Sequence, residues 1–475
     1  MSASVAEIKD RLERFGQAHL LRFIDELPRE DRTSFLGELQ SLDLEGLASL
    51  IDSHVKKVPE TEVPGEIAPP ACFPLVPDDD SAKALYTKAE ARGRRLLSDG
   101  KVCALTVAGG QGSRLGFDGP KGAYPITPIK RKTLFQVFAE SLRRAREKFS
   151  ASIPWYIMTS SANDAATRRF FEDNAYFGLE ADSVFFFTQG EMPAIGLDGK
   201  ILLRSKGALA MAPNGHGGTL LALRNSGALD SMREAGVDHI SYFQVDNPLV
   251  SVVSPVFIGL HDIEGSEMSS RALEKTGPFE KLGNYCVVDG RLTIIEYSDM
   301  PAELAEAKDA DGRLLFRLGS PAIHVISRTF VERLTGDGAF HLPWHRAEKK
   351  VPFLDVSGGF VEPSQPNAVK LETFIFDAIP MAENPIVVEA ARKEEFAPVK
   401  NKTGVDSAES CRLLLMERDA RWLEAAGVEI PRKDDGTLDC AVELSPNSFF
   451  DSEDVLARFD SENLVLNPGD ERYFD

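Results

Sequence analysis

Four apolar runs of strand length alternate with stretches of helical length between residues 101 and 247, and this alternation constrains the fold most. Each run is bounded by glycine, serine, asparagine or aspartate. Near-continuous apolar strands separated by helices predict a mostly parallel sheet covered on both faces, a Rossmann-like α/β core. Ligands of such sheets bind at the carboxyl ends of the strands. The runs are KVCALTVAGG, IPWYIMTS, SVFFFTQG and HISYFQVDN, and the expected helices cover residues 134–149, 164–174 and 218–236.

The flanking segments differ from this core. Apolar residues recur at helical spacing from about Ser4 to Ile51, with Pro28 at a helix boundary, which predicts a helical N-terminal segment. A proline-rich stretch over residues 57–80 predicts an extended connector that docks on a surface. After about Asn401, one helix and a turn-rich tail predict a small C-terminal domain. The expected domains are 1–95, helical segment and connector; 96–400, catalytic; and 401–475, C-terminal.

Composition excludes several classes of partner. The 475 residues carry a net charge of −20, so the overall field attracts neither nucleic acid nor an anionic membrane. A polyanionic substrate would have to bind through a few local cations. The five cysteines are dispersed without a CxxC pair, which argues against a disulfide framework and a structural zinc site. The N-terminal residues do not resemble a signal peptide and no apolar run has membrane-spanning length, which predicts a cytoplasmic protein.

The segment from Val107 to Gly122 is the sharpest local signal. It reads VAGGQGSRLGFDGPKG and follows a buried strand, so its glycines free backbone N–H groups to form a concave site for phosphate oxygens. Arg114 and Lys121 add two cations, one a planar fork and one a point charge. The dinucleotide pattern GxGxxG fails because Gly116 comes one residue late, and GxxxxGK[ST] is absent. The alternative is a glycine-rich turn that only connects a strand to a helix.

A second signal is Asp246, followed by Asn247, at the end of HISYFQVDN. A carboxylate at the ligand-binding edge of a sheet is a common position for Mg²⁺, which prefers hard oxygen ligands. An isolated Asp-Asn pair more often forms a turn or a helix cap. The nearby glycine loop favours the metal-binding interpretation.

The ordered motifs resemble the eukaryotic-type UDP-N-acetylglucosamine pyrophosphorylases, within the wider UDP-sugar pyrophosphorylase family. The resemblance covers nearly the whole chain and implies a nucleotidyltransferase core that joins UTP to a sugar 1-phosphate and releases pyrophosphate. Its most specific part is GGQGSRLGxxxPKG. Other matching motifs are GQAHLLRF, QGEMPAIGLDGKI, MAPNGHGG, VDNPLV, IIEYSDMP, QPNAVKLETFIFD and FAPVKN.

The resemblance implies a role for each matching residue. The nucleotide is expected to bind at Val107, Ala108, Gly109 and Gly110, with Gln189 reading the uracil edge and Gly215 contacting the base. The catalytic cations are Arg114, Lys121 and Lys370. Asp246 would bind Mg²⁺ or Mn²⁺. The sugar side would comprise His216, Gly283, Glu296, Tyr297 and Ser320.

Two sugar-side positions depart from the N-acetylglucosamine pattern. His216 replaces the asparagine of PxGNGG, and Ser320 replaces the asparagine of a Gly-Asn pair. N-acetylglucosamine 1-phosphate is the favoured acceptor, and glucose 1-phosphate or several sugars are the alternative. A third possibility is a non-catalytic UDP-sugar sensor, which would not need a metal carboxylate. The expected partners are therefore small substrates, neither nucleic acid nor membrane, and the oligomeric state stays open.

Overall fold

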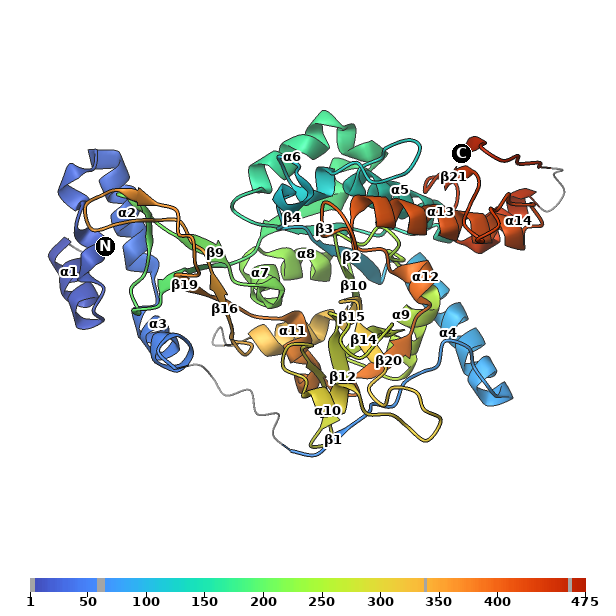
Figure 1. The fold of residues 1–475 in the computed structure, drawn as a ribbon, viewed down its shortest axis with the longest axis horizontal. Helices are drawn as coiled ribbons and strands as arrows, with labels where there is room; N and C mark the ends of the chain where they lie inside the picture. Colours follow the sequence, from blue (N-terminus) through green and yellow to red (C-terminus); the bar gives the residue numbers. More distant parts are fainter. Residues whose placement is uncertain (1–4, 58–64, 337–339, 460–463) are drawn as a thin grey trace. The chain divides into compact units, whose positions relative to one another are not determined.

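The computed structural model describes residues 5–57, 65–336, 340–459 and 464–475 (Figure 1). The chain forms two compact units. The N-terminal unit comprises Met1–Val63, Gly190–Gly218 and His341–Asp377. The core unit comprises Pro64–Gln189, Thr219–Phe340 and Ala378–Asp475.

The core unit is built on one large sheet, which confirms the α/β fold. Strands β10, β2, β3 and β4 are neighbours and run parallel, as the four apolar runs predicted. An arm of mainly antiparallel strands extends the sheet beyond β10. The order is β1 (Ile67–Ala68), β12 (Gly283–Val288), β14 (Leu318–Ser320), β11 (Met268–Glu274), β15 (His324–Ser327), β10 (His239–Gln244), β2 (Val102–Val107), β3 (Trp155–Thr159) and β4 (Val184–Thr188); β13 (Arg291–Ile295) pairs with β12 and β20 (Ile386–Glu389) with β11.

Helices cover both faces of the parallel block, and neighbouring residues of β3 show this directly. The Trp155 ring packs edge-on against Phe171 of α6 at 5.4 Å between centroids. The next residue, Tyr156, points to the other face, where its hydroxyl lies 3.0 Å from Ser231 Oγ of α8. The helices of this unit are α4 (Asp80–Ser98), α5 (Leu134–Phe149), α6 (Asp164–Asp173), α7 (Thr219–Asn225), α8 (Ala228–Glu234), α9 (Pro255–Ile263), α10 (Ala302–Ala305), α11 (Arg328–Thr335), α12 (Arg392–Glu395), α13 (Ala408–Ala425) and α14 (Ser452–Phe459).

Helices α4 and α9 cross at backbone contact because glycines stand at the crossing. A Cβ added at Gly93 would lie 1.8 Å from the Pro255 carbonyl oxygen, and one at Gly259 would lie 1.8 Å from the Ala89 carbonyl oxygen. Backbone atoms cannot move aside as the end of a flexible side chain does. The crossing therefore requires a residue without a Cβ at both positions.

Gly93→Ala is expected to lower the free energy of unfolding by about 3 kcal/mol, since overpacking against backbone forces the two helices apart. Denaturant unfolding followed by circular dichroism measures the change. Gly37→Ala is the matched control, because nothing lies within 4 Å of a Cβ at Gly37 in helix α2 (Arg29–Ser41). That substitution should raise stability by about 1 kcal/mol through helix propensity. Equal effects at the two positions would contradict the packing argument.

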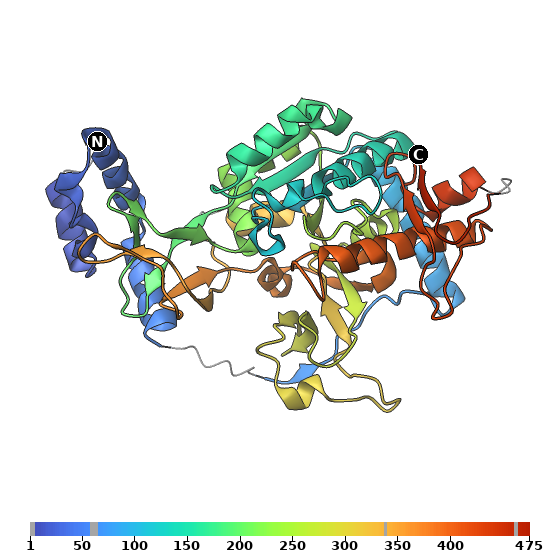
Figure 2. The same ribbon diagram turned by 45° about the horizontal axis from the view of Figure 1, so that its top comes forward.

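The C-terminal segment packs beside α5, and α13 can be followed there in Figure 2. Its own core includes Leu423, Val442 and Phe459. From α5, Lys148 Nζ lies 2.6 Å from both carboxylate oxygens of Asp451, and Arg144 Nε donates to Asp454. Strands β21 (Ala441–Leu444) and β22 (Glu471–Phe474) run parallel and complete this region.

The N-terminal unit contains the expected helices, and α2 begins directly after Pro28. Their apolar faces pack with Ile195, Ile201 and Leu371, which come from the two later segments of this unit. The helices are α1 (Val5–Arg14), α2 (Arg29–Ser41) and α3 (Leu44–Leu50), and the sheets pair β16 (His345–Lys349), β19 (Ala368–Glu372) and β6 (Ile195–Gly196), β5 (Glu191–Pro193) with β9 (Met211–Pro213), β7 (Leu203–Ser205) with β8 (Ala208–Leu209), and β17 (Phe353–Leu354) with β18 (Phe360–Val361).

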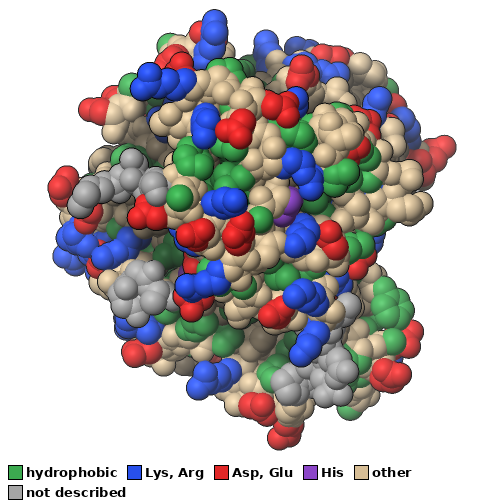
Figure 3. Space-filling model, turned by 90° about the vertical axis from the view of Figure 1, so that its left-hand side faces the viewer, with side chains coloured by type: hydrophobic (Ala, Val, Ile, Leu, Met, Phe, Trp, Pro, Cys, Tyr) green, Lys and Arg blue, Asp and Glu red, His purple; other side chains and the backbone are tan. Residues whose placement is uncertain are grey.

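The proline-rich connector docks on the core unit from residue 65 onward, as predicted: β1 pairs with β12, and the Phe73 N–H donates to the Val387 carbonyl at 2.9 Å. Residues 58–64 of the connector lie outside the described residues. The domain limits at residues 95 and 400 stay predictions. Among the described helices, none is long and apolar enough to cross a membrane. Acidic and basic side chains are interspersed on the face drawn in Figure 3.

Candidate active site

The glycine loop leaves the central strand β2 and closes on itself. The Lys121 N–H donates to the Gly110 carbonyl at 3.0 Å, and the Gly112 N–H donates to the Gly119 carbonyl at 2.9 Å. Gly116 adopts a left-handed conformation, with φ of 72°, where a side chain would be strained. Arg114 lies in the short turn between these contacts, exposed and without an ion pair to any described residue. The loop therefore presents Arg114 and Lys121 from one closed turn.

Two polar side chains fix the backbone at the start of the loop. Asn163 Nδ2 donates to the carbonyls of Ala108 and Gly110, at 2.9 and 3.2 Å. Ser160 Oγ donates to the Gly109 carbonyl at 2.8 Å. The carbonyls are thus satisfied, whereas the N–H groups of Gly109 and Gly110 donate to no described residue. Donors held in this way suit phosphate oxygens.

Lys121 and Asp246 meet beside the loop. Lys121 Nζ lies 3.2 Å from Asp246 Oδ2, and the two side chains are only 14% and 12% exposed. The strand ends are aligned because the Val245 N–H donates to the Val107 carbonyl. Lys121 is therefore an ion-paired, largely buried lysine, which its position in the glycine loop does not indicate. The sequence places the two residues 125 positions apart, and only the parallel pairing of β10 with β2 brings them together.

A divalent metal would have to share Asp246 with the substrate. No group of three or more His, Cys, Asp or Glu side chains suited to a metal occurs in the described part of the chain. Asn247 contributes no free ligand, since its side chain bonds the backbone of Glu395 and Ala397. One carboxylate completed by phosphate oxygens and water is a normal environment for Mg²⁺. The residues present therefore fit a metal that binds together with a nucleotide.

Gln189 ends strand β4 beside the start of the loop. Its N–H donates to the Thr159 carbonyl at 2.9 Å, and the residue is 9% exposed. A Cβ added at Gly109 would lie 2.8 Å from Gln189 Oε1, so the side-chain amide rests over that glycine. Both a donor and an acceptor thus reach the phosphate-binding segment.

Four of the five residues expected on the sugar side, all except His216, belong to the core unit. Gly283 of β12 pairs with Ser320 of β14, and Glu296 follows β13. A Cβ added at Gly283 would lie 3.3 Å from Glu296 Oε1. Ser320 Oγ lies 3.2 Å from the Tyr285 hydroxyl, and Tyr297 is 44% exposed. The structure thus brings Gly283, Glu296 and Ser320 together, with Tyr297 adjacent to Glu296 in the chain.

Three expected site residues belong to the N-terminal unit. Gly215 has a φ of 85°, and a Cβ there would lie 2.3 Å from the Thr373 carbonyl oxygen. The His216 ring stacks on Phe374 at 5.3 Å, and its Nδ1 accepts the Ile375 N–H at 3.2 Å. Lys370 lies on β19 opposite Ala347, half-buried and without an ion pair to a described residue. Their contacts with a substrate stay predictions.

His216 should remain neutral well below pH 6, because burial, aided by His345, lowers its pKa to about 4. A base with a lowered folded-state pKa stabilises fully above its unfolded pKa, and this stability is lost as the pH falls toward 4. His216→Asn keeps an acceptor for the Ile375 N–H and removes the titration. Between pH 7 and pH 5, the wild type should lose about 2 kcal/mol more unfolding free energy than this variant. Equal losses in denaturant unfolding at the two pH values would contradict a neutral, buried ring.

The sequence reasoning missed several residues of this region. Asn163 and Ser160 orient the loop but carry no charge that marks them in the sequence. The Val399 N–H donates to the Asp246 carbonyl at 2.8 Å, so the segment that contains Lys400 is bonded to the backbone of Asp246. Lys402 lies 3.7 Å from a Cβ position at Gly116. The available signal was one lysine, Lys400, within the mainly apolar motif FAPVKN, with Lys402 shortly after it.

Comparisons with known proteins identify a family and related structures. Residues 73–469 match the family model described as UTP–glucose-1-phosphate uridylyltransferase. The chain is 37% identical over 442 residues to the human UDP-N-acetylhexosamine pyrophosphorylase-like protein 1, covering 90% of this chain and 86% of the relative. It is 33% identical to the UDP-N-acetylglucosamine pyrophosphorylase of Saccharomyces cerevisiae, covering 95% and 97%. The crystal structure of uridine diphosphate N-acetylglucosamine pyrophosphorylase from Trypanosoma brucei, in complex with an inhibitor, superposes with a TM-score of 0.80 at 25% identity, covering 99% of both chains.

Proposed function

The chain belongs to the UTP–glucose-1-phosphate uridylyltransferase family, and we propose that it transfers uridylyl from UTP to N-acetylglucosamine 1-phosphate. The observation that carries the proposal is the Lys121–Asp246 pair beside a glycine loop whose N–H groups at Gly109 and Gly110 donate to no residue that the structure describes. A cation, a metal carboxylate and fixed donors at one strand edge are what a triphosphate requires. The acceptor follows from the relatives whose names specify N-acetylglucosamine.

In this reaction a phosphate oxygen of the sugar 1-phosphate attacks the α-phosphorus of UTP. The bond from that phosphorus to the bridging oxygen breaks, and pyrophosphate leaves. Two anions must meet, so charge neutralisation and alignment dominate the barrier. The loop N–H groups and Arg114 hold phosphate oxygens, and Lys121 stabilises charge at the reacting phosphate.

Mg²⁺ or Mn²⁺ bound at Asp246 would neutralise phosphate charge and orient the phosphates. No protein nucleophile is needed, because the attacking phosphate is already an anion. Cys103 is also unsuited to that role, since complete burial within β2 raises the pKa of its thiol. We propose that Gln189 reads the uracil edge, and that Gly215, His216 and Lys370 have the roles that the resemblance implies.

The proposal is tested by pyrophosphate release from UTP and Mg²⁺ with a panel of sugar 1-phosphates. N-acetylglucosamine 1-phosphate should give the highest kcat/KM. A preference for glucose 1-phosphate, or equal use of several sugars, would show that the proposed acceptor is wrong and that uridylyl transfer is right. Binding of UDP-sugar without release from any acceptor would identify a sensor. Cytoplasmic location stays a prediction.

His216→Asn should raise the ratio of kcat/KM for N-acetylglucosamine 1-phosphate over glucose 1-phosphate. An asparagine amide offers a flexible donor and acceptor for an acetamido group, whereas the imidazole is rigid and its Nδ1 already accepts the Ile375 N–H. One hydrogen bond in such a site changes the ratio roughly three- to tenfold. Both acceptors are measured at saturating UTP and Mg²⁺. An unchanged ratio with intact rates would show that His216 does not act on the sugar.

A further inference from the structure

A cavity of about 880 Å³ lies in the core unit at the carboxyl ends of β11 and β20, outside the site described above. Its walls come from these two strand ends, from α12 and α13, and from the connector at Leu75. We call it the Lys275 cavity. Its volume falls in the range of sites that hold small metabolites.

Cations dominate this cavity although the whole chain is strongly acidic. Three carboxylates and five cations line it. Three of the cations are neutralised. Arg392 pairs with both carboxylate oxygens of Glu280, and Arg317 pairs with Glu389. Arg313 pairs with two aspartates, Asp309 and Asp311. Lys275 and Lys393 have no carboxylate within ion-pair distance among the described residues. The cations are Lys275, Arg313, Arg317, Arg392 and Lys393.

Lys275 is the unusual member. It is 7% exposed, and its Nζ donates to Asn284 Oδ1 at 2.5 Å, an amide that offers no charge. Burial lowers the pKa of this lysine. Placing an ammonium in such a wall without a counter-ion is costly, and a bound anion would remove that cost. An ionisable group perturbed by burial at a cavity is a functional-site signal.

The remaining lining is apolar. Leu75 and Leu414 are 49% and 39% exposed, and Phe396 contributes a buried ring. Five cations and three carboxylates leave the lining with an excess of two positive charges. This excess suits a dianion, which a phosphate monoester supplies near neutral pH. The apolar residues suit a ligand whose phosphate is attached to an apolar body.

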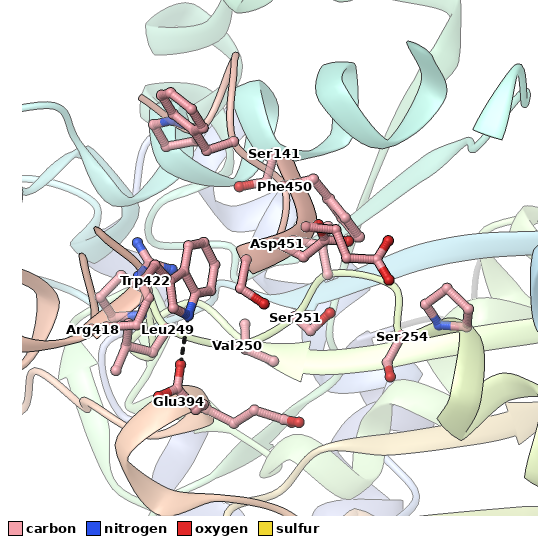
Figure 4. Close-up of a pocket in the computed structure, with 18 of the residues that line it drawn as sticks. Ser141, Leu249, Val250, Ser251, Ser254, Glu394, Arg418, Trp422, Phe450 and Asp451 are labelled. Atoms are coloured by element: carbon pink, nitrogen blue, oxygen red, sulfur yellow. Dashed lines mark hydrogen bonds between the residues drawn. The ribbon is translucent and has the colours of Figure 1, made fainter. Parts of the chain in front are cut away.

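A second cavity supplies the contrast. It lies between α12, α13 and the turn before α14, where Trp422 Nε1 donates to Glu394 in Figure 4. Every charged side chain that lines it has an opposite charge among the described residues, as Glu395 has Arg271 and Glu453 has Arg94. Its electrostatics are satisfied without a ligand. The Lys275 cavity differs because its buried cation, Lys275, has no ion pair with a described carboxylate.

The Lys275 cavity lies behind the strands that carry the sugar-side cluster. Cross-strand partners share a face of a sheet, so Asn284, Gly319 and Leu273 point to one side. The neighbouring pair of Gly283 and Ser320 points to the other. Asn284 also donates from Nδ2 to the Ile295 carbonyl, directly before Glu296. A ligand that binds Lys275 would thus act through Asn284 on the backbone that positions the sugar-side residues.

We propose that the Lys275 cavity is a second ligand site, which binds an organic phosphate monoester with an apolar body. A ligand bound there changes the KM for the sugar 1-phosphate through Asn284. Only this effect on KM rests on the proposed function. Binding itself does not depend on turnover.

Phenyl phosphate is the probe, titrated calorimetrically into the full chain without nucleotide. Lys275→Gln keeps a donor for Asn284 Oδ1 and removes the charge, so affinity should fall at least about tenfold. Lys393→Gln, at an exposed position, should also weaken binding and leave basal activity unchanged. Arg418→Gln, in the second cavity, is the matched control and should retain wild-type affinity.

Three outcomes would overturn the proposal. One is equal affinity in the wild type, Lys275→Gln and Lys393→Gln. Another is loss of binding in Asp246→Asn with full binding in Lys393→Gln, which would place the probe in the glycine loop. The third is equal affinity for inorganic phosphate and phenyl phosphate, which would show that the cavity does not recognise an apolar body. If Lys275→Gln does not fold, Lys393→Gln decides. Calorimetry without substrates also separates this failure from a failure of uridylyl transfer.

Discussion

Asp246→Asn is expected to lower kcat for uridylyl transfer by about 10³-fold or more, with the fold retained. The amide keeps the shape of the carboxylate but loses the charge that a divalent cation requires. A metal that neutralises the reacting phosphates contributes several kcal/mol to the transition state, and each 1.36 kcal/mol is about tenfold in rate. Steady-state rates across a Mg²⁺ titration measure the loss.

Two measurements distinguish a metal role from a structural role for Asp246. UTP should still bind the variant weakly, since the glycine loop and Gln189 do not act through the metal. Lys121→Met removes the other member of the ion pair and leaves a carboxylate that is 12% exposed without its counter-ion, so it should also lower stability. Full activity of Asp246→Asn at limiting Mg²⁺ would show that Asp246 only pairs with Lys121.

The central part of the fold could be predicted because each strand and helix there is marked by the pattern of apolar residues within its own segment. The four apolar runs became the parallel strands β2, β3, β4 and β10, and residues 134–149 became α5. The stretch 218–236 was expected as one helix but forms two. Ser226 and Gly227 interrupt it, and Gly227 has a φ of 80°, which a helix does not allow.

Contacts that join distant segments could not be predicted in this way. Helix α4 was absent from the sequence prediction, and its place depends on Gly93 and Gly259 meeting backbone 160 or more positions away. The N-terminal unit collects three segments, and nothing in residues 190–218 shows that they join the first helices. The environment of His216 could not be predicted for the same reason, because its stacking partner, Phe374, lies 158 positions later in the chain.

In the candidate site, the sequence likewise identified the residue types that carry charge but not the contacts that surround them. The sequence identified Arg114, Lys121 and Asp246 from glycine spacing and strand ends. It could not show that Lys121 is paired, because the pairing depends on the register in which β10 joins β2. Asn163 was missed because it binds backbone carbonyls and no charge marks it. Side chains that position others are thus found from contacts, and those that carry charge are found from sequence.

The strongest selectivity expected is for UTP over ATP, by about 10⁴-fold in kcat/KM. Gln189 is buried at the end of β4 and presents an amide donor and acceptor beside the nucleotide loop. Uracil presents a complementary N–H and carbonyl. A purine would leave buried polar groups unpaired, which costs more than the loss of one apolar contact. CTP should be rejected for the same reason, because its edge reverses a donor and an acceptor.

The test compares the four ribonucleoside triphosphates and dTTP with the wild type, Gln189→Ala and Gly109→Ala. Gln189→Ala removes the amide and should lower discrimination against CTP most, since cytosine and uracil have the same size. A Cβ at Gly109 would lie 2.8 Å from Gln189 Oε1, so Gly109→Ala should displace the amide and reproduce part of this loss. Equal rates with UTP and dTTP would show only that the pocket admits a methyl group and does not test the 2′-hydroxyl. Equal rates with UTP and ATP in the wild type would refute the uridylyl assignment, because a pocket shaped to hydrogen-bond the edge of a uracil ring cannot accept the larger purine equally well.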